Sequence, residues 1–118
     1  MPGTRRLCGT ICVAIALSII AFHAQAAETT IDQKTMKFVP DAVTINAGDS
    51  VRFTNSDRFY HDVTIVNPDG TTNDKGLMKY KEEFAVSFAN PGVYKVRCRL
   101  HPAMKAVITV KQPDAQPH

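Results

Sequence analysis

Apolar and polar residues alternate along most of the chain after Met36. Such alternation places every second side chain on one face, which is the pattern of a half-buried β-strand. The alternating apolar positions are Val43 and Ile45, Val51 and Phe53, Val63 and Ile65, Phe84, Val86 and Phe88, and Tyr94 and Val96. The chain after residue 27 has no clear helical periodicity, and we expect at most one helical turn, over residues 73–81. The pattern predicts an all-β domain.

Turn signals separate the predicted strands. They are Ala47-Gly48-Asp49, the sequence Asn-Pro-Asp-Gly at residues 67–70, and the sequence Asn-Pro-Gly at residues 90–92. Clusters of Gly, Pro, Asn and Asp favour tight turns because these residues accept the backbone angles that turns require. Short strands joined in this way are typical of an antiparallel sandwich or barrel.

Residues 1–26 have the three-part layout of a secretory signal peptide. Arg5 and Arg6 precede an apolar run at residues 7–22, and the sequence Ala24-Gln25-Ala26 follows. The run is shorter than the roughly 20 residues that span a bilayer, which disfavours a membrane anchor. We expect export to the periplasm, cleavage after residue 26 or 27, and no stable membrane insertion afterwards.

The remaining chain is long enough for one small domain, which we place at residues 27–112, with a disordered tail at residues 113–118. Loss of Arg5 and Arg6 lowers the count of Lys and Arg from 14 to 12 against 11 Asp and Glu, so the net charge falls from +3 to +1. A nearly neutral domain is not expected to bind nucleic acid.

Cleavage would also leave Cys98 as the single cysteine, because Cys8 and Cys12 lie in the signal peptide. One thiol cannot form an internal disulfide, and in an oxidising compartment it needs burial, a catalytic role or a metal. Cys98 falls on the inward face of the preceding strand. His101 and Met104 follow at intervals of three residues, in a loop that Pro102 tightens. The loop can therefore direct all three side chains to one point.

His61 is the other histidine inside the predicted domain. It could reach Cys98 only if its strand and the strand before Cys98 are neighbours. Two imidazoles and a thiolate with a weak axial thioether are the donor set of a type 1, or blue, copper site. Sulfur suits Cu(I) and nitrogen suits Cu(II), so a mixed set needs little rearrangement during electron transfer. With Met104 in the axial direction there is no obvious open position for a substrate, which argues against an enzyme.

Each residue also has a more ordinary explanation. Cys98 alone could be a small core residue, Met104 could fill the core, and His61 could be a surface histidine paired with Asp62. Three other functions stay open: copper trafficking or sequestration, a thiol enzyme with Cys98 as its nucleophile, and a structural zinc site. Copper carriers tend to use several Met, so Met36 and Met78 would support trafficking only if they lie beside Met104.

Three segments carry a resemblance to the cupredoxin family of plastocyanin, pseudoazurin, azurin and amicyanin. They are MKFVPDAVTINAGDSVRFTN, SDRFYHDVTIV and VYKVRCRLHPAMKAVITV. The spacing Cys-x-x-His-x-x-Met, with Pro after His, is similar to the short ligand loop of amicyanin. The resemblance implies a Greek-key β-sandwich and one copper ion per chain, cycling between Cu(II) and Cu(I) in a soluble one-electron carrier. The ligands that it implies are His61, Cys98, His101 and Met104.

The resemblance also implies how partners dock. The edge of the His101 ring would emerge through an apolar patch that includes Leu100 and Pro102, and redox proteins would bind there to a monomer. The short loop hints at an amine dehydrogenase as donor and a cytochrome as acceptor, although loop length says little about partners. We also expect an acidic partner to be steered by three basic residues near the ligands: Arg97, Arg99 and Lys105.

Two positions depart from the family pattern. Asp62 stands where the family commonly has an Asn that helps connect the two ligand loops. An ionised Asp can accept a hydrogen bond but cannot donate one. Pro102 has no N–H, so one potential donor to the Cys98 sulfur is absent.

Overall fold

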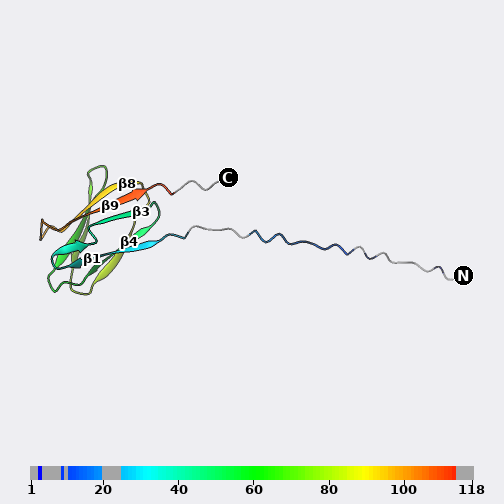
Figure 1. The fold of residues 1–118 in the computed structure, drawn as a ribbon, viewed down its shortest axis with the longest axis horizontal. Coiled ribbons are helices and arrows are strands. Elements are labelled where there is room, and N and C mark those ends of the chain that lie inside the picture. Colours follow the sequence, from blue (N-terminus) through cyan, green and yellow to red (C-terminus); the bar gives the residue numbers. More distant parts are fainter. Residues whose placement is uncertain (1–2, 4–8, 10, 20–24, 114–118) are drawn as a thin grey trace.

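The computed structural model describes residues 3, 9, 11–19 and 25–113, and the strands form a two-layered sandwich (Figure 1). Residues 114–118, which make up most of the predicted tail, lie outside the described residues, as do parts of the predicted signal peptide. The strands in the described part are β1 (Glu28–Lys34), β2 (Lys37–Val39), β3 (Ala42–Asn46), β4 (Ser50–Asn55), β5 (His61–Val66), β6 (Thr72–Met78), β7 (Glu83–Ser87), β8 (Gly92–Arg97) and β9 (Lys105–Lys111).

The strands are divided between two sheets. One has the order β2-β1-β4-β7 and the other the order β3-β9-β8-β5-β6. Pairing is antiparallel except for β1 with β4 and β3 with β9, which are parallel. Because neighbours in a sheet are mostly distant in sequence, the chain crosses repeatedly between layers, as in a Greek-key sandwich. The prediction of an all-β Greek-key fold is confirmed.

The core lies between the two sheets and is formed by the alternating apolar positions. Val51, Phe53, Val63 and Val96 are fully buried, and Ile65 is nearly so. Apolar burial of this kind is the main favourable contribution to folding. The period-two pattern therefore identified the inward faces of these strands correctly.

Strands β1, β2 and β6 were not predicted. The alternation begins after Met36, so it missed β1, whose buried positions are Ile31 and the polar Gln33. Residues 73–81 do not form a helical turn, because most of this segment belongs to β6. β6 lies at the edge of its sheet and is exposed along most of its length, so it has no apolar stripe that could reveal a strand.

The pairing of β5 with β8 positions the functional residues. Thr64 lies opposite Arg97 and Ile65 lies opposite Val96, so the start of β5 runs beside the segment that follows β8. His61 opens β5, and the Cys98 loop connects β8 to β9. The sequence analysis required these two strands to be neighbours if His61 was to reach Cys98, and they are.

The described residues 11–19, which fall in the predicted signal peptide, run away from the sandwich (Figure 1). Their apolar side chains, such as Ile11 and Leu17, are exposed. The described residues contain no helix that is long and apolar enough to cross a membrane.

Candidate metal centre

The loop between β8 and β9 is closed by its own backbone hydrogen bonds. The His101 N–H donates to the Cys98 carbonyl at 3.3 Å, and the Met104 N–H donates to the His101 carbonyl at 2.8 Å. The Cys98 N–H donates to the Met104 carbonyl at 3.3 Å, which closes the loop at its base. This compact turn contains Pro102, whose nitrogen has no N–H to donate.

Three donor atoms converge beside this loop. Cys98 Sγ lies 3.8 Å from His61 Nδ1 and 3.7 Å from His101 Nδ1, and the two nitrogens are 3.1 Å apart. Metal bonds of about 2.0 Å to nitrogen and 2.3 Å to sulfur produce donor separations of this size around a common ion. The structure therefore brings together the Cys and the two His that the sequence singled out.

Met104 lies at the end of the same loop. Its side chain is buried, and its backbone makes hydrogen bonds with the backbones of both Cys98 and His101. The loop thus holds the thioether residue next to the other two donors. Its role as an axial ligand stays a prediction.

Comparison with known proteins agrees with this donor set. Residues 25–111 match the family described as copper binding proteins of the plastocyanin/azurin family. The chain belongs to this family. This cupredoxin is thus related to electron-transfer copper proteins.

Individual relatives include both amicyanin and plastocyanin. The chain is 32% identical to amicyanin-alpha of Methylorubrum extorquens over 91 residues, covering 75% of this chain and 76% of that protein. It is 33% identical to the chloroplastic plastocyanin of Tetradesmus obliquus over 99 residues, covering 75% of this chain and 68% of that protein.

Solved structures show the same fold. An amicyanin variant in its Cu(I) form has a TM-score of 0.66 at 22% identity, over 71% of this chain and 82% of that chain. A copper-containing nitrite reductase from Thermus scotoductus also scores 0.66, at 27% identity, but the match covers only 23% of that longer chain and 73% of this one.

Asp57 is part of the site although the sequence analysis did not identify it. Its Oδ2 lies 2.8 Å from His61 Nε2, and its carboxylate also accepts the N–H groups of Thr35 at 2.7 Å and Met36 at 2.8 Å. Burial raises the pKa of the Asp57 carboxyl, but hydrogen bonds from Met36, His61 and Thr35 outweigh it and hold the pKa below its ordinary value. The only sequence signal was an acid four residues before His61.

The hydrogen bond to Asp57 determines which ring nitrogen of His61 can act as a metal donor. A carboxylate can only accept, so Nε2 carries the proton and Nδ1 keeps its lone pair toward Cys98. Carboxylate–histidine–metal arrangements fix a ligand ring in this way. The cupredoxin therefore has two imidazole donors and a sulfur donor oriented for a copper ion, and the residues present fit that metal. The alternative pairing of His61 with Asp62 is not what the structure shows.

Asp62 connects the two ligand segments. Its N–H donates to Cys98 Sγ at 3.4 Å, and its carboxylate accepts the backbone N–H of Arg99. The Arg99 Nε donates to the same carboxylate at 2.7 Å. Burial raises the pKa of the Asp62 carboxyl, but hydrogen bonds from the Arg99 side chain, the Arg99 backbone and Cys98 hold it below its ordinary value. Asp62 thus makes the connection expected of Asn.

The basic residues near the site are not equivalent. Arg99 pairs with Asp62 and with Asp74. Its part in steering a partner stays a prediction. Arg97 and Lys105 lie directly opposite each other on β8 and β9, and the residues that the structure describes offer neither of them an ion pair.

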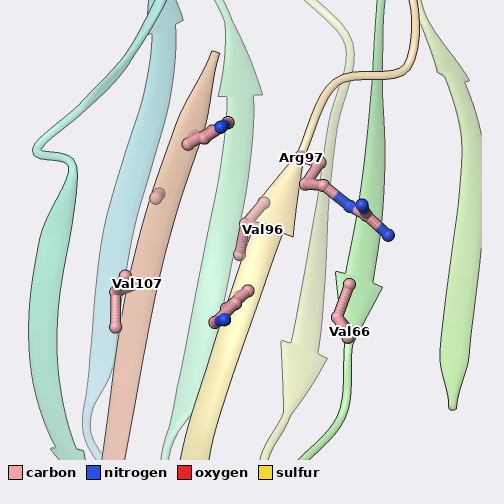
Figure 2. Close-up of a pocket in the computed structure, with 7 residues that line it drawn as sticks. Val66, Val96, Arg97 and Val107 are labelled. Atoms are coloured by element: carbon pink, nitrogen blue, oxygen red, sulfur yellow. The ribbon is translucent and has the colours of Figure 1, made fainter. Parts of the chain in front are cut away.

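A shallow hollow marks the outer face of the five-stranded sheet at this point. Figure 2 shows Arg97 extending from β8 over β5, above Val66, with Val96 on β8 itself and Val107 on β9. Lys95 and Lys105 complete the basic border of this hollow. A second hollow, which shares Arg97 and Lys105 with the first, is lined by Cys98 and Pro102.

Proposed function

We propose that this cupredoxin is a soluble periplasmic one-electron carrier that binds one copper ion through His61, Cys98, His101 and Met104. The observation that carries the proposal is the convergence of Cys98 Sγ with the two Nδ1 atoms at 3.1–3.8 Å in a buried pocket. Bound copper would supply a one-electron couple, Cu(II)/Cu(I). With its four donors the site leaves no protein group free for substrate chemistry, so we propose a carrier and not an enzyme.

The chain's own residues keep the site fixed and dry. Asp57 holds the His61 ring, and the Asp62 N–H holds the Cys98 sulfur. Because His61, Cys98 and Met104 are buried, water reaches the donors only near His101. A ligand set that cannot relax between oxidation states keeps the reorganisation small, which is what a carrier requires.

His101 offers the route for electrons. It is half-buried, and its neighbours Leu100 and Pro102 are exposed, with Leu100 51% exposed. We propose that redox proteins, such as a dehydrogenase donor and a cytochrome acceptor, dock on this apolar surface of a monomeric protein. The exposed apolar residues 11–19 and the basic pair before them support removal of residues 1–26 on export.

We further propose that Lys95, Arg97 and Lys105 attract an acidic partner. Arg97 and Lys105 lie opposite each other, and like charges in this arrangement are destabilising, so an acidic partner would offset their repulsion. Replacing all three by Gln should weaken the salt dependence of electron transfer to an acidic redox protein. An unchanged salt dependence would disprove the steering role.

The deciding experiment is the visible absorption spectrum of residues 27–118 after addition of Cu(II), beside the variant Cys98→Ala. We expect an intense band toward the red end of the spectrum that is bleached reversibly by a mild reductant and is absent from the variant. Such a band requires a thiolate–copper bond. Absence of the band from the unmodified protein would overturn the proposal.

The same experiment tests copper trafficking. Met78 lies opposite His61 on β6, but its Sδ accepts the Gln33 Nε2–H at 3.1 Å, and Met36 is partly exposed in the β1–β2 turn. Neither supplies a free thioether beside Met104 in the described part of the chain. Tight binding of Cu(I) without a Cu(II) band would favour trafficking over electron transfer.

A further inference from the structure

A buried acid next to two metal-site residues needs an explanation. Asp62 is 1% exposed, follows His61 directly and bonds Cys98 Sγ through its N–H. Its carboxylate accepts the Arg99 N–H, which connects the two ligand segments. A neutral amide oxygen could accept that bond equally well. What the carboxylate adds is a negative charge, and an unpaired buried charge is costly.

Arg99 compensates this charge. Its Nε donates to Asp62 Oδ2 at 2.7 Å, while its Nη2 donates to Asp74 Oδ2 on the neighbouring strand β6. The three side chains lead from the interior to solvent, with side-chain exposures of 2% for Asp62, 63% for Arg99 and 41% for Asp74. Asp74 therefore fixes the outer end of the guanidinium that neutralises the buried acid.

We propose that Asp62, Arg99 and Asp74 are positioning residues that together set the reduction potential of the copper site. A negative charge beside the thiolate favours Cu(II), and a guanidinium fixed against that charge cancels its effect. Held by Asp74, Arg99 stays in the orientation that cancels it. The inference rests on the proposed function, since it requires copper at the site.

The main test is a double-mutant cycle on the potential, measured by redox titration of the visible band. Arg99→Gln exposes the Asp62 charge and should shift the Cu(II)/Cu(I) equilibrium about tenfold toward Cu(II), which is about 59 mV for one electron. Asp62→Asn should shift it toward Cu(I). The double variant should return close to the unmodified protein, because removing both members of the ion pair leaves no uncancelled charge beside the sulfur.

Arg97→Gln is the matched control. It removes the same charge two residues away, from an exposed side chain with no carboxylate partner among the residues described. Its shift should be several-fold smaller than that of Arg99→Gln and should vanish at high salt. Arg99→Lys keeps the positive charge but loses the forked guanidinium, so its potential should lie between those of the unmodified protein and Arg99→Gln. Asp74→Asn should shift the potential less than Arg99→Gln does.

The outcomes separate this inference from the proposed function. Absence of the band from the unmodified protein would overturn both. If the band is present but Arg99→Gln and Arg97→Gln shift the potential equally, or the double variant does not return close to the unmodified potential, the inference is wrong. If Arg99→Gln lowers only the unfolding temperature and leaves the potential unchanged, the three residues are structural and the inference is again wrong.

Discussion

The two histidines of the site have opposite surroundings. His61 opens a central strand, is fully buried, and has its Nε2 held by Asp57. His101 lies in a loop, is half-buried, and is flanked by the exposed Leu100 and Pro102. Their rings nevertheless meet, with centroids 4.9 Å apart at an angle of 68°.

The difference shows how one site can meet two demands. The His61 side is fixed by the fold, which keeps the donor geometry constant. The His101 side is open, which would allow a partner to come close to the proposed metal ligands. Changes on the first side should therefore affect stability and metal binding, and changes on the second side should affect electron exchange.

The largest contrast should appear in the stability of the copper-free protein. His61→Ala leaves a buried cavity and removes a partner of the Asp57 carboxylate, so it should lower the free energy of unfolding by about 2–4 kcal/mol. His101→Ala should cost less than about 1 kcal/mol, since its side chain is partly in solvent. Urea denaturation measures both. Equal losses would mean that the two sides are not different in rigidity.

Copper affinity should depend on the His61 support. Asp57→Ala removes the acceptor of three hydrogen bonds and should weaken copper binding by about 10–100-fold, because the His61 ring is no longer oriented. Asp69→Ala is the control, since Asp69 likewise accepts hydrogen bonds from Thr71 in an exposed turn between β5 and β6. Competition with a chelator gives the affinities. A similar loss in both variants would contradict a specific role for Asp57.

The smallest effect should be kinetic and confined to the His101 side. Leu100→Glu places a charge in the proposed docking surface and should slow electron self-exchange by about tenfold, or about 1.4 kcal/mol in activation free energy. Val93→Glu adds the same charge at the far end of β8, where the side chain is equally exposed at 51%. NMR line broadening in mixtures of oxidised and reduced protein measures the rate. Equal slowing by both changes would place docking elsewhere.

The parts of the site that the sequence predicted are those that local spacing or strand alternation controls. Cys98, His101 and Met104 share one short loop, and the inward face of β8 gave the direction of the thiol. His61 required only that β5 and β8 be neighbours, and the family resemblance supplied that expectation.

The parts that were missed depend on contacts with strands that lack an apolar pattern. Asp57 is held by the turn after β1, a strand that buries Gln33 beside Ile31. The partner of Arg99 on β6 could not be foreseen because that edge strand is mostly polar and was expected to contain a helical turn. Ion pairs between strands could therefore be identified only from the structure.

The hydrogen bonds from Thr35 and Met36 to Asp57 make the donor set depend on the first hairpin of the domain as well as on its last loop. The parts that orient the donors extend from Thr35 to Met104, which is most of the domain. Copper should therefore bind the complete fold in preference to partly folded chains, and ligand in hundredfold excess over its Kd adds about 2.7 kcal/mol to the folded state. Metal loading would then act as a late, selective step in maturation, after which unfolding and proteolysis both become rarer.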